Sequence, residues 1–131
     1  ERSTDWLLGE ALTNLYVGLC RFRRGEKLSA ARFVQQFAVD RVIELYENGH
    51  PSSGASRDPF VSERRLELAH PALAEWLPRF VPGYERTPEA AVALLEFLAT
   101  RYPVNEALAH AIRRLAGTSS GGDGITGQQP P

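Results

Sequence analysis

The residue whose type fits its position least well is Arg41, which falls on an apolar helix face. Placing residues at 100° each from Ala30 to Leu45 puts Arg41 in the middle of that face. Asp40 and Glu44 lie along its edge. A guanidinium keeps its charge, so its burial requires a carboxylate and further hydrogen-bond acceptors. The pattern therefore predicts a polar site around Asp40, Arg41 and Glu44.

A second polar cluster lies within residues 58–67. Glu63 and Glu67 are four residues apart, so on a helix they share a face, with Arg64 beside it and Arg65 farther round. Such a face can be solvated and held by local ion pairs that contribute little stability. It can also meet the Arg41 site across a groove, as an ion-pair network or an anion site. Both interpretations stay open.

Arg65 and His70 also have the R-x4-H spacing of a metal-independent ribonuclease motif found in helical HEPN domains. In that chemistry the arginine stabilises a phosphorane-like charge and the histidine moves a proton. Leu66 departs from the polar residue that the family usually carries after the arginine. A HEPN-type RNA-binding or ribonuclease domain is therefore an alternative, beside a plain protein-interaction bundle.

Four basic residues, Arg21, Arg23, Arg24 and Lys27, gather where the first helix should end. They could contact a phosphate or RNA backbone. Basic residues at a helix C-terminus are also favourable for the helix dipole, and Glu26 reduces the positive charge of the cluster. The dipole explanation is the simpler one.

Other catalytic signatures are missing from the sequence. No Gly-rich phosphate-binding motif, serine nucleophile elbow or pair of histidines at metal-ligand spacing occurs. The single cysteine, Cys20, lies inside an apolar helix and is expected to be a core residue. We therefore expect no metal site. One unpaired thiol and the lack of a signal peptide favour the cytoplasm.

The elements that position these residues are helices, since no convincing strand pattern occurs. We expect a helix from Thr4, as N-cap, to Arg24, and a second from about Ser29 to Gly49. The remaining segments are a loop over 49–61, short helices over 62–70 (capped by Ser62) and 71–77, a central apolar helix after the Thr87 cap, and a last helix over 104–116. This predicts an all-α, antiparallel four- to five-helix bundle.

The 131 residues suit one domain, with 43% hydrophobic and 24% charged residues. We expect the bundle over residues 1–116 and a disordered tail or linker remnant over 117–131, which is rich in Gly, Ser, Gln and Pro. The net charge of −1 predicts no nucleic-acid footprint over the whole chain. The sequence has no Met and starts at Glu1, which favours a domain fragment.

Four stretches carry a resemblance to a family: Leu15–Leu19, Arg23–Ala30, Phe33–Leu45 and Pro59–Glu67. They resemble the helical C-terminal domain of bacterial nucleotidyltransferases related to the aminoglycoside and lincosamide resistance enzymes. The resemblance extends over about residues 5 to 102.

The resemblance implies an accessory domain that contributes to acceptor-substrate or nucleotide binding. Mg²⁺ and the nucleotide triphosphate would be held by an N-terminal catalytic domain with a Gly-Ser motif and paired acidic residues, which this chain lacks. The chain would be inactive alone. The groove toward that domain or its substrate would include Asp40, Arg41, Glu44, Glu63, Arg64, Arg65 and Glu67. A buried structural network of the same residues is the alternative, and whether two copies pair is left open.

Overall fold

The computed structural model describes residues 1–51 and 63–117, and every regular element in them is helical. The elements in order are α1 (Thr4–Arg23), α2 (Lys27–Arg32), a π-helix η1 (Phe33–Ala38), α3 (Val39–Gly49), α4 (Leu66–Ala69), α5 (Pro71–Ala74), α6 (Leu77–Phe80), a 3-10 helix η3 (Tyr84–Arg86), α7 (Thr87–Ala99) and α8 (Glu106–Leu115). The all-α class predicted from the sequence is therefore confirmed.

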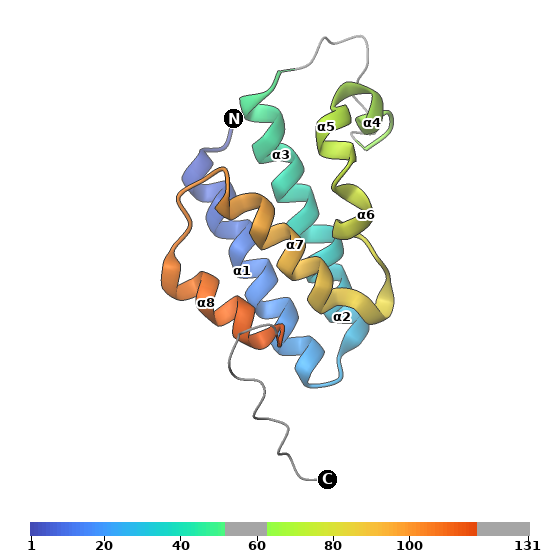
Figure 1. Cartoon of the computed structure of the whole chain (residues 1–131), viewed down its shortest axis with the longest axis vertical. Coiled ribbons are helices and arrows are strands. Elements are labelled where there is room, and N and C mark those ends of the chain that lie inside the picture. Colours follow the sequence, from blue (N-terminus) through green and yellow to red (C-terminus); the bar gives the residue numbers. More distant parts are fainter. Residues whose placement is uncertain (52–62, 118–131) are drawn as a thin grey trace.

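Helix α1 is the centre of the packing, because it contacts α2, η1, α3, α7 and α8 (Figure 1). Its inward stripe consists of Leu7, Leu8, Ala11, Leu12, Leu15, Gly18 and Leu19. Helix α7 is buried over most of its surface, as its apolar composition predicted. The short helices α4 to α6 lie beside α3 and α7 in Figure 1 and add Leu66, Leu73 and Phe80 to the same apolar core.

Several helix starts differ from the predictions. Ser3, not Thr4, caps α1, since the backbone N–H of Trp6 donates to Ser3 Oγ at 3.1 Å. Thr87 begins α7 rather than capping it, and its buried Oγ1 instead accepts a hydrogen bond from Gln35 Nε2 at 2.9 Å. Helix α8 starts at Glu106, after the cap Asn105, whose side-chain oxygen accepts a hydrogen bond from the Leu108 N–H at 2.9 Å.

The predicted helix over 62–70 is wrong at its start, because residues 63–65 form a turn and α4 begins at Leu66. Arg65 is left-handed, with φ of 65°, a conformation that a continuing helix does not contain. Glu63 and Glu67 therefore do not share a helix face. The predicted cap Ser62 and most of the predicted loop lie outside the described residues, as does the tail from 118 on.

The second long helix is continuous from Lys27 to Gly49 but contains the π-helix η1 in its middle. A π-helix bonds residue i to i+5, so its wider turns rotate every later residue relative to a regular α-helix. The assumed 100° step is therefore wrong here. Phe37, predicted on the core face, is 41% exposed, and the Arg41 side chain is only partly buried.

Gly18 allows η1 to lie close against α1. A Cβ at this position would lie 2.6 Å from Val34 Cγ2 and 3.1 Å from Phe33 Cβ. Val34 is fully buried. Because Gly18 has no side chain, α1 leaves room for Val34 and Phe33 of η1 to pack directly against its backbone.

Cys20 is partly exposed, so the prediction that it is a core residue is wrong; it follows the buried Leu19 on α1.

Within the described residues, no helix combines the length and apolar character that crossing a membrane requires.

Candidate functional site

Two neighbouring hollows lie along α3, one bordered by the chain before α1 and the turn at Glu63, the other by α1 and η1. One, of about 360 Å³, is lined by Arg2, Asp40, Arg41, Ile43, Glu44, Glu47 and Glu63. The other, of about 250 Å³, is lined by Glu10, Asn14, Phe37, Asp40 and Arg41. Because both include Asp40 and Arg41, we call them together the Arg41 groove.

The structure brings together four of the seven residues predicted for the site: Asp40, Arg41, Glu44 and Glu63. Arg64, Arg65 and Glu67 line neither hollow and are exposed on the turn and on α4. The π-helix accounts for the orientation of the three residues on α3, whereas Glu63 comes from the turn before α4. The π-helix turns Phe37 and Arg41 away from the apolar core and toward the groove.

Arg41 is enclosed but weakly paired. Its side chain is 24% exposed, and one guanidinium nitrogen (Nη1) lies 4.0 Å from Glu44 Oε1, beyond hydrogen-bond distance. Its guanidinium carbon lies 6.0 Å from the centre of the Trp6 ring. Arg41 therefore enters the groove with most of its hydrogen-bonding capacity unused by the described residues.

The carboxylate expected for Arg41 is held by Arg2. Arg2 Nε donates to Glu44 Oε2 at 3.0 Å, and Arg2 Nη2 donates to Glu44 Oε1 at 2.5 Å. These hydrogen bonds, and secondarily the positive charges of Arg2 and Arg41, lower the pKa of Glu44. The guanidinium of Arg2 also lies 4.9 Å from the centre of the Trp6 ring. The bidentate geometry explains why Arg2 rather than Arg41 binds this carboxylate.

Asp40 has the opposite electrostatic balance. Its partial burial raises the pKa of its carboxyl group, and the nearby charge of Glu63 raises it further, while Arg41 only partly opposes this. The groove therefore combines a carboxyl group whose pKa is raised with an arginine that has few hydrogen bonds to the described residues.

Several residues of the groove were not predicted from the sequence: Arg2, Glu10, Asn14, Phe37, Ile43 and Glu47. Glu10 and Asn14 lie four residues apart on the polar side of α1, a signal that could have indicated a lined groove. Nothing in the sequence indicated Arg2, which reaches Glu44 across 42 positions.

The HEPN alternative gains no support from the geometry. His70 is only 6% exposed, its Nε2 lies 3.4 Å from Glu47 Oε2, and its ring contacts Tyr46 edge-on. Arg65 is exposed on the turn before α4. A histidine that moves a proton on a substrate must reach that substrate, and this ring is enclosed by α3.

The basic cluster is paired within the chain. Arg21 donates to Ser29 Oγ, Arg23 to the Leu115 carbonyl, Arg24 to Glu26 and Lys27 to Glu85. Arg21 and Arg23 therefore tie α1 to α2 and to the end of α8, so the cluster has a structural role within the described residues.

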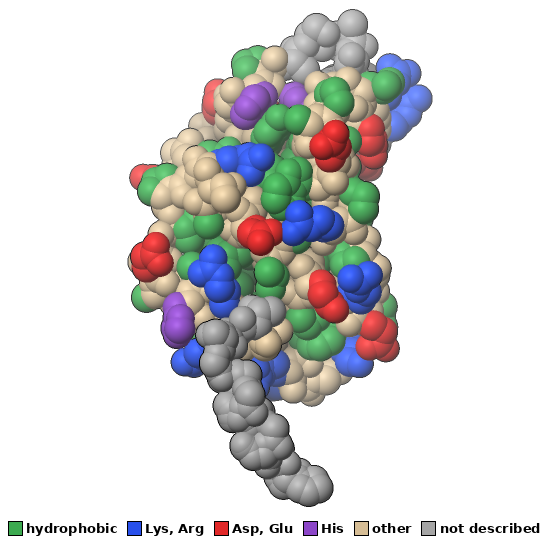
Figure 2. Space-filling model, in the orientation of Figure 1, with side chains coloured by type: hydrophobic (Ala, Val, Ile, Leu, Met, Phe, Trp, Pro, Cys, Tyr) green, Lys and Arg blue, Asp and Glu red, His purple; other side chains and the backbone are tan. Residues whose placement is uncertain are grey.

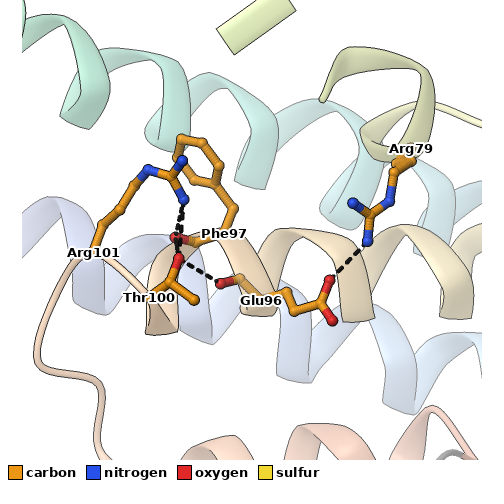
Figure 3. A network of polar contacts seen from close by, with 5 residues as sticks. All are labelled: Arg79, Glu96, Phe97, Thr100 and Arg101. Carbon is orange, nitrogen blue, oxygen red and sulfur yellow. Dashed lines mark hydrogen bonds and ion pairs between the residues drawn. The ribbon is translucent and has the colours of Figure 1, made fainter. Parts of the chain in front are cut away.

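A larger hollow of about 650 Å³ lies where α6, η3 and α7 meet the ends of α1 and α8, with an apolar floor that includes Pro78, Pro82, Val92 and Ala93. Its charged rim pairs internally, as Arg79 does with Glu96 at 2.7 Å (Figure 3). Beside it, Arg101 lies over the Phe97 ring and bonds to Thr100 Oγ1 and the Phe97 carbonyl. Figure 2 shows charges of both signs mixed with apolar side chains over this face.

Within the described ranges, no group of three or more His, Cys, Asp and Glu side chains is arranged to hold a metal ion. The fold and site thus define an all-helical chain with a mixed-charge groove. Comparison with protein-family models, curated proteins and solved structures gives no match.

Proposed function

We propose that this chain is an accessory helical domain of a nucleotidyltransferase-like protein, and that the Arg41 groove contributes to binding of an acceptor substrate or nucleotide. The proposal includes the expected antiparallel bundle, formed by α1, the α2–η1–α3 helix, α7 and α8. It also includes a cytoplasmic location, in keeping with the single thiol.

One observation carries this proposal. Four of the residues that the resemblance assigns to a groove line one hollow, with Asp40, Arg41 and Glu44 contributed by α3 and Glu63 by the turn before α4. A purely structural network would be expected to pair Arg41 more closely, because a partly buried charge gains stability from a carboxylate within hydrogen-bond distance. Here Arg2 binds Glu44, and Arg41 is left directed to the groove.

The groove has groups for two tasks. The guanidinium of Arg41 can bind a phosphate or carboxylate oxygen. Asp40 or Glu63 can accept a proton from, or orient, a hydroxyl or amine. Mg²⁺ and the nucleotide triphosphate would be held by a separate catalytic domain, so the chain would assist the reaction without performing it.

The complete coding sequence of the parent protein tests the proposal first. A Gly-Ser motif followed by paired acidic residues on strands is expected in the same polypeptide or in a dedicated partner.

The second test measures nucleotidyl transfer by the parent protein, where Arg41→Gln should lower kcat/KM at least tenfold and Arg24→Gln should not. Absence of the motif, or equal activity of both variants, would refute the proposal.

A further inference from the structure

The charges of the Arg41 groove restrict the chemistry of its ligand. Arg41 is about three-quarters buried, and among the described residues its carboxylate contact, to Glu44, is at 4.0 Å. A guanidinium has five N–H donors in a fixed planar arrangement that matches a carboxylate or phosphate. An anionic group that enters the groove would therefore meet a cation that the described residues leave weakly paired.

Carboxylates line the same hollows as this cation. Asp40 shares both hollows with Arg41, Glu63 lines the first hollow, and Glu10 lines the second. Burial raises the pKa of Asp40 and the charge of Glu63 raises it further. A bound ammonium group would favour the ionised form of Asp40 by the opposite effect.

A ligand with a single charge fits this arrangement poorly. An anion on Arg41 would be repelled by Asp40 and Glu63, and a cation on these carboxylates would be repelled by Arg41. The two hollows, of about 360 and 250 Å³, limit the ligand to a small molecule. The partly exposed rings of Trp6 and Phe37 provide apolar surface beside the charges.

We propose that the Arg41 groove binds a small zwitterion, with its anionic group on Arg41 and its amine on Asp40 and Glu63. The inference rests on the proposed function only in assigning binding to the same groove, and it specifies the ligand chemistry. The zwitterion is defined by one anionic group and one amine separated by a short apolar chain.

Three matched probes test the inference on the 131-residue chain: 5-aminopentanoate, pentanoate and pentylamine. Binding is followed by NMR shifts of the Trp6 indole N–H and the arginine Nε–H groups. The zwitterion should bind at least tenfold more tightly than either half. Pentylamine that binds as tightly as 5-aminopentanoate would overturn the inference in favour of a simple cation site, and so would a lack of binding by all three.

Two variants separate the two ends of the ligand. Arg41→Gln should weaken 5-aminopentanoate and pentanoate at least fivefold and leave pentylamine unchanged. Asp40→Asn should weaken 5-aminopentanoate and pentylamine and leave pentanoate unchanged or tighter. Arg24→Gln, at the other end of α1 and paired with Glu26, is the control. Circular dichroism of each variant confirms folding, and loss of all three probes from both folded variants would contradict the assigned orientation.

These outcomes differ from those of the proposed function. Zwitterion binding by the chain does not require a catalytic domain, so it can hold where the nucleotidyltransferase motif is missing. Conversely, a parent protein with that motif and an Arg41-dependent activity, but with no preference for 5-aminopentanoate over its halves, would keep the proposed function and refute the zwitterion.

Discussion

At the scale of single residues, the competition of two arginines for one carboxylate decides the state of the groove. Arg2 holds Glu44 by two hydrogen bonds, whereas Arg41 lies 4.0 Å from the same group. Two arginines thus share one well-placed acceptor. Arg2, the more exposed of the two, binds Glu44, and Arg41 remains available to a ligand in the groove.

The first prediction follows from this competition. In Arg2→Ala, Glu44 loses its bidentate partner and can turn toward Arg41, so Arg41 should become less available to an anion. We expect pentanoate and 5-aminopentanoate to bind several-fold more weakly, as measured by NMR titration. Adding Glu44→Gln to Arg2→Ala should restore binding, because no carboxylate then competes. Weak binding by the double variant would show that Arg2 acts in another way.

The second prediction concerns the pH dependence of stability. Glu44 has a pKa below its ordinary value of 4.5, so its stabilising contribution is complete above that pH and is lost as pH falls through the lowered pKa. Glu44→Gln should therefore be less stable than the wild type at pH 7, and the difference should shrink in acid.

Asp40 should behave in the opposite way, because its pKa is raised above its ordinary value of 3.8. Its favourable contribution is present below that pH and is lost as pH rises through the raised pKa. Asp40→Asn should thus equal or exceed the wild type in stability at pH 7 and lose that advantage in acid. Urea unfolding at pH 3, 5 and 7 measures both variants, and pH slopes of the same sign would refute the electrostatic assignment.

At the scale of elements, the π-helix links the packing to the site. It brings Gln35 to Gly83 and Thr87, where its side-chain amide bonds to the Gly83 carbonyl at 2.7 Å and to Thr87 Oγ1 at 2.9 Å, and accepts from Gly83 N–H at 3.0 Å. It also turns Phe37 into the groove lining. One irregular element thus both fixes the start of α7 and forms part of the candidate site.

The third prediction tests the contact between α1 and η1. Gly18→Ala would place a Cβ 2.6 Å from Val34 Cγ2, and the overpacking should cost about 1–3 kcal/mol of unfolding free energy. Gly9→Ala is the matched control, since its Cβ meets nothing within 4 Å and alanine should stabilise the same helix by about 0.5–1 kcal/mol. Chemical denaturation compares the two, and equal effects would contradict the close approach. Val34→Ala should relieve much of the cost at Gly18.

The fourth prediction concerns the Gln35 hydrogen bonds. Gln35→Leu removes the partner of the fully buried Thr87 hydroxyl, which should cost about 1–3 kcal/mol. Hydrogen exchange should show the loss of amide protection first at the start of α7. Gln36→Leu, on the same helix but exposed, is the control, and similar destabilisation by both would mean that the bonds contribute little.

At the scale of the whole molecule, one apolar cluster joins the short helices to the longer ones. It contains Leu66, Leu73 and Phe80 together with residues of α1, η1, α3, α7 and α8. Trp76 adds to these contacts, since its ring packs near Phe80 and Phe97 and lies within 4.6 and 5.5 Å of the guanidinium carbons of Arg79 and Arg101. The α4–α6 segment is therefore expected to unfold with the remainder of the molecule.

The fifth prediction uses the two tryptophans as reporters. The Trp6→Phe variant keeps one tryptophan, Trp76, in the α4–α6 region, and the Trp76→Phe variant keeps one tryptophan, Trp6, on α1. In each variant the fluorescence transition should coincide with the loss of helical circular dichroism. A separate, earlier transition of Trp76 in the Trp6→Phe variant would show that α4 to α6 form an independent unit.

The sequence by itself determined the helical class and the long helices, because apolar periodicity is a local property. It predicted Asp40, Arg41, Glu44 and Glu63, which line one hollow, but placed Glu63 on a helix that begins only at Leu66. Only the tertiary structure decided that Arg2 binds Glu44, that α1 borders the groove, and that η1 changes the helical phase. These features depend on contacts between segments far apart in the sequence, such as Arg2 with Glu44 and Val34 against Gly18. A helical wheel with a regular 100° step describes only one segment at a time, so it cannot predict them.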